Sequence, residues 1–147
     1  AVRALRTPGH SPRHLTLVLE NGGEERPEAA IVGDLAAASG SVWVGHPEGD
    51  VAAYLASLER ILALAPRVVG PGHGPAIVAV QKRLKELMQH RLEREEQVLA
   101  ALEPGQATAA ELTALLLILL PPTGTASTKG TRRRCWSWRS RACWLTC

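Results

Sequence analysis

The chain has 147 residues, 46% of them hydrophobic, which is enough for one compact domain, or for one domain and a fraction. The net charge of +3 hides a division, because 11 basic and 14 acidic residues lie before position 129, whereas six basic and no acidic residues follow. The longest apolar run, Leu112–Leu120, is too short to cross a bilayer, and the sequence shows no signal-peptide pattern.

The first half predicts strands joined by turns. Residues 15–19 form an apolar strand candidate that ends at the turn-forming sequence Asn21-Gly22-Gly23. A polar hairpin tip leads into a second short strand, residues 29–32, which delivers Gly33 and Asp34. Residues 36–49 contain Gly, Ser and Pro without a clear period, so we interpret them as a loop. We also expect the first residues of the chain to form a strand.

The second half predicts two long helices with a strand between them. Asp50 is a suitable N-cap for a helix through Leu64, and a brief strand at 67–69 feeds a Pro-Gly-His loop. A helix over 77–102 follows, with most of an apolar stripe. Thr108 and Glu111 have the spacing of a capping box, so another helix is expected to begin there. The alternation of strands and helices indicates an α/β domain.

Three widely separated side chains are candidates for a metal site. His10 lies in TPGH, Asp34 in IVGD and His73 in VVGPGHGP, each beside glycine after a short apolar run. Neutral imidazole suits zinc, iron and copper, and a carboxylate can bridge two cations. A single His in such a turn is more often a hydrogen-bonded loop residue, so the prediction rests on the joint pattern. The three residues alone make a partial site.

The same segments, in this order, resemble the C-terminal half of a metallo-β-lactamase-fold hydrolase. The likeness covers about residues 1–118 and is closest to the branch of β-lactamase-like protein 2, an endoribonuclease, with hydroxyacylglutathione hydrolases more distant. It implies an αβ/βα sandwich of which roughly half is present. The motifs that carry it are residues 7–11, 33–34, 41–45, 47–50 and 71–75, and His90-Arg91 with Arg94-Glu95.

By this resemblance, His10 binds a first zinc ion, Asp34 bridges two ions and His73 binds the second. The two ions would activate a water molecule against an RNA phosphodiester or, as the alternative, a thioester. The family's H-x-H-x-D-H motif, which supplies three His and an Asp, is absent from the sequence. We therefore expect the parent protein to be an enzyme and this chain alone to be inactive, or a non-catalytic remnant.

Trp43 and His90 each have two open interpretations, and His14 and His46 have minor roles. Trp43 could form a wall of the substrate cleft or anchor its loop in the core. His90 could approach the substrate pocket or lie on a helix surface, with Arg91 paired to Glu95. We interpret His14 as a strand-start residue that supports the site, and His46 as a loop residue.

The domain boundaries predicted are 1–103 for the metallo-β-lactamase part, 104–122 for the start of a winged-helix-like domain, and 123–147 for a disordered basic tail. The tail's arginines and tryptophans could bind single-stranded nucleic acid, although an out-of-frame or alternatively spliced end is the preferred interpretation. Uncovered core surface predicts poor solubility or self-association. All three cysteines lie in this tail without metal-binding spacing, which favours a reducing, intracellular compartment: mitochondrial matrix or cytoplasm.

Missing motifs exclude the serine hydrolase, cysteine hydrolase and nucleotide-binding classes. The sequence contains no Gly-rich phosphate loop and no G-x-S-x-G elbow, and the body before the tail has no cysteine to act as a nucleophile.

Overall fold

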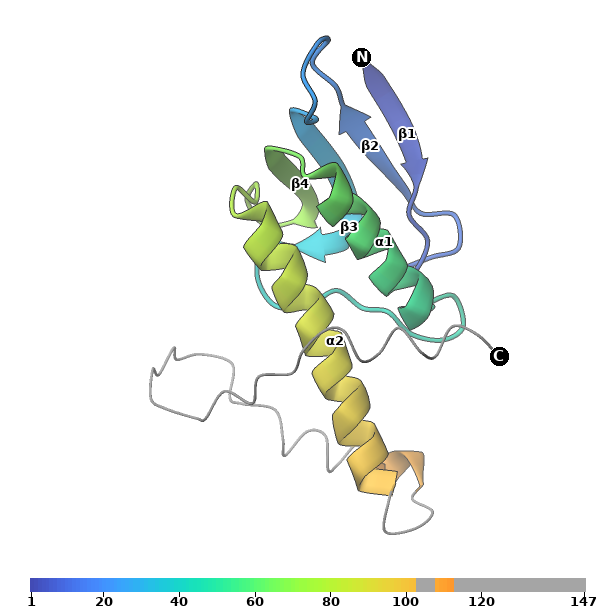
Figure 1. Ribbon diagram of the computed structural model, residues 1–147. Helices are drawn as coiled ribbons and strands as arrows, with labels where there is room; N and C mark the ends of the chain where they lie inside the picture. The colour runs from blue at the N-terminus through green and yellow to red at the C-terminus, as the bar shows by residue number, and fades with distance from the viewer. Residues whose placement is uncertain (103–107, 113–147) are drawn as a thin grey trace, which may run out of the picture.

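The computed structural model describes residues 1–102 and 108–112. Its order of elements is β1 (Val2–Arg6), β2 (Leu15–Leu19), β3 (Ala29–Ala37), α1 (Val51–Leu64), β4 (Val68–His73) and α2 (Val80–Leu102). The four strands form one sheet in the order β1-β2-β3-β4, antiparallel except for the parallel pair β3 and β4. The α/β class predicted from the sequence is confirmed (Figure 1).

Both helices pack on the same face of the sheet. Val18, Val32 and Val69 point from the strands into this face and are fully buried. Tyr54, Leu58 and Ile61 of α1 and Leu84 of α2 are fully buried in the same cluster. One hydrophobic core therefore lies between the sheet and the helix pair, and among the described residues no element covers the opposite face of the sheet.

Helix α1 begins and ends as its sequence predicts. The Asp50 side chain accepts a hydrogen bond of 2.9 Å from the backbone N–H of Ala53, which satisfies one free donor of the first turn. Ala65, at φ 48°, ends the helix in the left-handed conformation, and its N–H donates to the carbonyls of Ile61 and Leu62. Pro66 follows and is buried.

Three boundaries differ from the sequence prediction. Strand β4 continues to His73 rather than ending at residue 69, so His73 lies in the strand and not in a loop. Strand β3 continues to Ala37 rather than ending at residue 32, because residues 33–37 pair irregularly with β4 across two bulges. Helix α2 begins at Val80 rather than at Ile77, since Ile77 forms an antiparallel bridge with Val69 through hydrogen bonds of 2.8 and 3.0 Å. Each error came from a pairing between residues distant along the chain.

A capping box is present at residues 108–112. The Glu111 carboxylate accepts from the N–H of Thr108 at 2.7 Å, and the Thr108 hydroxyl accepts from the N–H of Glu111 at 3.3 Å. The bond from the Thr108 N–H, together with one of 2.8 Å from the Thr108 hydroxyl to the same carboxylate, lowers the pKa of Glu111. The rest of the predicted winged-helix-like segment and the basic tail lie outside the described residues. Within the described part of the chain, no helix is long and apolar enough to cross a membrane.

Candidate metal centre

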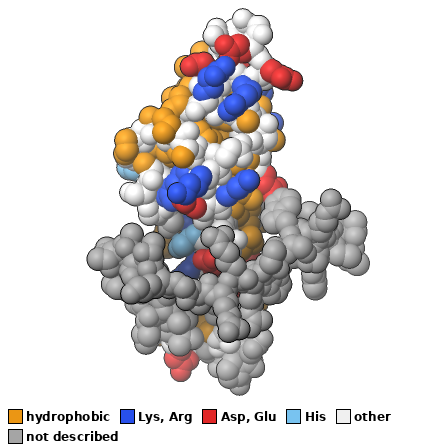
Figure 2. All heavy atoms as spheres, turned by 60° about the vertical axis from the view of Figure 1, so that its left-hand side comes forward, with side chains coloured by type: hydrophobic (Ala, Val, Ile, Leu, Met, Phe, Trp, Pro, Cys, Tyr) orange, Lys and Arg blue, Asp and Glu red, His pale blue; other side chains and the backbone are white. Residues whose placement is uncertain are grey.

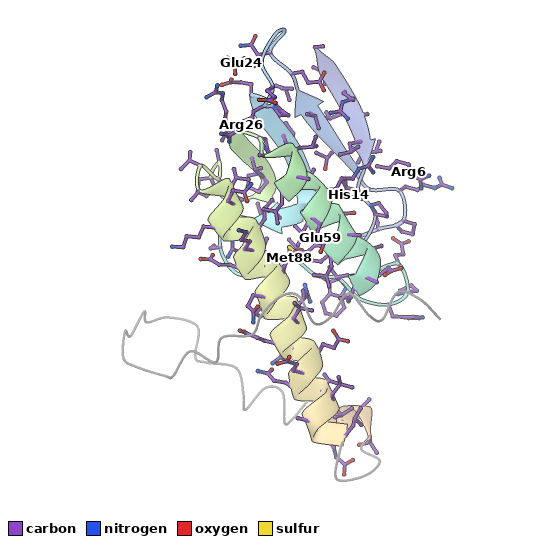
Figure 3. All side chains as sticks on the ribbon, in the orientation of Figure 1. Arg6, His14, Glu24, Arg26, Glu59 and Met88 are labelled. Carbon is purple, nitrogen blue, oxygen red and sulfur yellow. The ribbon has the colours of Figure 1, made fainter. Side chains whose placement is uncertain are left out.

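The three predicted ligands meet at one end of the sheet. Asp34 lies in the irregular part of β3, between Gly33, which pairs with Pro71, and Ala37, which pairs with His73. Because β3 and β4 run parallel, their carboxyl ends place Asp34 and His73 at the same edge. His10 comes from the turn between β1 and β2. Figure 3 labels His14, which closes this turn immediately before β2.

Each imidazole faces a different oxygen of the Asp34 carboxylate. His10 Nε2 lies 3.7 Å from Asp34 Oδ2, and His73 Nε2 lies 3.2 Å from Asp34 Oδ1. All three side chains remain accessible to solvent: His10 is the most enclosed, with 30% of its side chain exposed, and His73 the least, with 79%. The geometry thus places one carboxylate between two separate imidazole nitrogens.

The protonation of the His10 ring follows from its other contact. His10 Nδ1 lies 2.8 Å from the backbone carbonyl of Trp43, an atom that can only accept. Nδ1 therefore carries the proton, and in the neutral ring Nε2 presents its lone pair toward Asp34. A lone pair and a carboxylate repel each other unless a proton or a cation lies between them, so the arrangement suits a cation.

Helix α1 holds the turn that carries His10. The Asp50 N–H donates to the Gly9 carbonyl at 2.8 Å, and the Ser57 hydroxyl donates to the Pro8 carbonyl at 2.7 Å. Gly9 has φ +139°, and a side chain there would place its Cβ 2.3 Å from Tyr54 Cα. Only glycine permits both this conformation and this close approach.

A second glycine makes room for the carboxylate. A Cβ on Gly72, in β4, would lie 2.6 Å from Asp34 Oδ1 and 3.0 Å from the carbonyl carbon of Gly33. Real Cβ atoms do not come this close, so a side chain at position 72 would displace the carboxylate. The glycines of the predicted motif therefore serve close packing as well as turning.

His14 lies directly before β2, as expected, and its supporting role at the site stays a prediction. Its Nδ1 lies 2.9 Å from the hydroxyl of Thr7, which in turn lies 2.9 Å from the hydroxyl of Thr16. Both threonines are fully buried, and the His14 ring stands edge-on to His10 with centroids 6.3 Å apart. Burial lowers the pKa of His14 and favours its neutral form, although a hydrogen bond with the Thr7 backbone acts in the opposite direction.

Trp43 does not anchor the loop in the core. Its side chain is 75% exposed, whereas its neighbours Val42 and Val44 are buried. The indole folds back over Gly45, where a Cβ would lie 2.5 Å from a ring carbon. The Trp43 side chain is thus open to solvent, and its role in binding substrate stays a prediction.

The predicted pairing of Arg91 with Glu95 is wrong. Arg91 donates to the backbone carbonyl of Val42, and its guanidinium carbon lies 5.5 Å from the centroid of the Tyr54 ring. His90 is half-buried, and its Nδ1 has no hydrogen-bond partner among the described residues. Burial lowers the pKa of His90, with Arg91 and Arg94 adding to the effect. No contact of His90 with the three ligands is found, and His46 is an exposed loop residue, as expected.

The donor set fits part of a metal centre. Within residues 1–102 and 108–112, no group of three or more His, Cys, Asp or Glu side chains could hold a metal ion. The three candidates instead supply one shared carboxylate and one imidazole on each of its oxygens. These are the donor types of a bridged pair of ions, in too small a number to complete either one.

Comparison with known proteins relates this geometry to a family. No protein-family model matches the chain. Among curated proteins, an atrochrysone carboxyl ACP thioesterase of Aspergillus fumigatus is 35% identical over 132 residues, covering 82% of this chain and 39% of the relative. A β-lactamase-like protein 2 homolog of Caenorhabditis elegans is 32% identical over 113 residues, covering 76% of this chain and 35% of the relative.

Solved structures give the same result. A metallo-β-lactamase family protein of Thermus thermophilus superposes with a TM-score of 0.67 at 35% identity, covering 78% of this chain and 38% of that protein. A β-lactamase domain protein of Burkholderia ambifaria superposes with a TM-score of 0.66 at 31% identity, covering 79% and 36%. The chain spans less than half the length of these relatives, with which it shares sequence and fold; it belongs to the metallo-β-lactamase superfamily.

Proposed function

We propose that this chain forms one wall of a two-metal hydrolytic centre, with His10, Asp34 and His73 as its ligands. The observation that carries the proposal is the placement of two imidazole nitrogens on the two oxygens of one carboxylate. Such a carboxylate can hold two cations close together, which lowers the pKa of a shared water molecule and stabilises developing negative charge. Zinc is the proposed metal, because histidine and carboxylate ligands suit it.

This chain's own residues would do three things in that centre. Asp34 supplies the negative charge between the two cation positions, and His10 and His73 supply neutral donors on either side. The Trp43 carbonyl holds the Nδ1 proton of His10 and so leaves Nε2 unprotonated for a cation. The exposed indole of Trp43 offers a flat surface for a base or another planar group of the substrate.

Two substrate classes are supported to different degrees. We propose hydrolysis of single-stranded RNA for the parent enzyme, in line with the likeness to the β-lactamase-like protein 2 branch. Thioester hydrolysis is the alternative, and the relative named as an acyl-carrier-protein thioesterase favours it. If the purified chain with added zinc cleaves a single-stranded oligoribonucleotide but not an acyl thioester, the result favours the first class, and the reverse favours the second.

A non-catalytic role is the second candidate. It is favoured by the absence, among the described residues, of any group of three ligands for one ion. Such a remnant could bind nucleic acid through the basic residues after position 128, and filter binding with and without residues 129–147 tests this. A mitochondrial or cytoplasmic location stays a prediction.

Metal analysis decides between an enzyme and a remnant. About two equivalents of zinc together with turnover would support the enzyme, whereas substoichiometric metal without turnover would support the remnant. Asp34→Asn removes the charge between the imidazoles and should abolish metal binding. Asp50→Asn is the matched control, because asparagine caps a helix as well as aspartate does. Equal metal binding by Asp34→Asn and the wild type would contradict the proposed centre.

A further inference from the structure

We propose that Arg91 is a positioning residue for His10, which acts through the backbone of Val42 and Trp43 to keep Nε2 of the imidazole available to a cation. The inference deepens the proposed function, since it concerns how that site is kept ready. It starts from a long charged side chain on α2 whose partner is a loop carbonyl rather than a carboxylate.

Two contacts hold the Arg91 side chain in place. Its guanidinium donates to the Val42 carbonyl and lies against the ring of Tyr54. Tyr54 is fully buried, and its backbone is the surface on which Gly9 packs. A cation held over the face of an aromatic ring is attracted to it, so the contact favours this position of the guanidinium. Arg91 therefore joins the loop at 42 to the helix that holds the His10 turn.

Trp43, the next residue along the loop, contacts the proposed metal ligand His10 through its backbone carbonyl. The Trp43 carbonyl accepts from His10 Nδ1, and the buried side chains of Val42 and Val44 anchor the backbone on either side. The Trp43 side chain faces solvent and contributes nothing to this bond. The position of the accepting carbonyl is thus set by Val42, Val44 and the hydrogen bond from Arg91.

Loss of the hydrogen bond to the Trp43 carbonyl would change which nitrogen of the His10 ring carries the proton. A neutral imidazole carries one proton, which the Trp43 carbonyl keeps on Nδ1. Without that acceptor the proton can move to Nε2, the nitrogen that faces Asp34. A protonated Nε2 cannot bind a metal, so Arg91 controls the availability of the ligand without touching it.

The other arginine of α2 that holds the loop provides a comparison. Arg83 donates through Nε to the Ala37 carbonyl at 2.9 Å and through its guanidinium to the carbonyl of Gly40. These two hydrogen bonds hold a segment next to His73, whose carbonyl accepts from the Ala38 N–H at 3.3 Å. Removal of Arg83 should loosen the loop at 37–40 and leave the 42–43 segment in place.

The direct test is the tautomer of His10, measured by long-range ¹H–¹⁵N NMR on the full metal-free chain at pH 8.5. Wild-type His10 should carry its proton on Nδ1. In Arg91→Met the Nδ1-protonated population should fall by at least half, whereas Arg91→Lys, which keeps a donor for Val42, should retain most of it. Arg83→Met tests loosening of the loop elsewhere, and Lys82→Met is a control at an exposed cation on the same helix.

Several results would overturn the inference. They are wild-type His10 protonated on Nε2, an unchanged tautomer in folded Arg91→Met, equal losses in the Met and Lys variants, or an equal loss in Arg83→Met. If Arg91→Met does not fold, the wild-type and Arg91→Lys measurements still decide.

Cobalt titration provides a separate readout. Removal of a group that orients a metal-binding histidine costs about 10–100-fold in metal affinity, and Arg91→Met should fall in this range. A chain that shows the predicted tautomers yet binds no cobalt would refute the proposed metal centre and leave the positioning role of Arg91 intact.

Discussion

The two faces of the sheet differ although the same strands build both. Along β2, Thr16 and Val18 point toward the helices and are fully buried, whereas Leu15 and Leu17 point away and are 52% and 44% exposed. Ile31 of β3 pairs with Leu17, and Val2 of β1 is also exposed on the bare side. An alternating strand is expected to be polar on a solvent face, whereas the bare face of this sheet carries apolar side chains.

The bare face offers an apolar surface to another layer of protein. Hydrophobic side chains reach the surface of the described body in Figure 2. We propose that the bare face is covered either by the remaining part of the metallo-β-lactamase fold or by a second copy of the chain. Stability should then come from the helix-covered face and association from the bare one, and each prediction below tests part of that division.

The largest effect is expected in the covered core. Leu58→Ala removes a fully buried side chain between α1 and the sheet and should lower the free energy of unfolding by about 2–5 kcal/mol. Leu17→Ala, the same change on the bare face, should cost well under half as much. Urea denaturation of both variants measures the difference, and similar losses would show that both faces contribute equally to the core.

The second-largest effect on stability is expected at the N-cap of α1. Asp50→Ala removes the acceptor for the Ala53 N–H and should destabilise the chain by about 1 kcal/mol. Asp50→Asn should remain within a few tenths of the wild type, because asparagine is an equivalent cap. A stable Asp50→Ala variant would mean that α1 is held by packing alone.

A smaller effect concerns pH. Burial lowers the pKa of His90 in the folded chain; Arg91, Arg94 and Arg83 act in the same direction and Glu93 opposes them. The unfolded chain then binds more protons, so the free energy of unfolding should fall as the pH drops below about 6.5, the ordinary histidine value. His90→Gln should weaken this dependence in chelator-treated protein, and the lowered pKa of His14 should sustain the remainder. An unchanged slope in His90→Gln would contradict the prediction.

The smallest effect on stability, and the largest on association, is expected from the bare face. Leu17→Thr with Ile31→Thr keeps strand-forming residues and should change the free energy of unfolding by about 0.5 kcal/mol or less. Light scattering should show the wild type above its monomer mass of 15.7 kDa at high concentration and the variant closer to it. A wild type that stays monomeric would argue against a second copy on this face.

The sequence predicted the local features of the fold and the meeting of the ligands. The Asp50 cap and the capping box at Thr108 depend on residues three apart, so their signals are complete in the sequence. The approach of His10 and His73 to Asp34 came from motif order and resemblance. Since both contacts join distant segments, no local pattern could have shown them.

The features that the sequence did not predict depend on contacts between distant residues. The local sequence around these residues fits more than one structure. Ala36 and Ala37 looked like loop, and their place in β3 depends on pairing with β4. Ile77 fitted the apolar stripe of α2 yet pairs with Val69. Arg91 had a glutamate four residues on, a common helix pairing, but its side chain reaches a loop carbonyl instead.

The contact between Gly72 and Asp34 has a consequence for natural variation. Position 72 donates nothing to a cation, yet the smallest side chain there would intrude on Asp34 Oδ1. In a saturation mutagenesis screen it should therefore tolerate as few replacements as the ligands themselves. One base change in a glycine codon, giving alanine, should therefore shift the Asp34 carboxylate and weaken cation binding while every ligand remains in the gene.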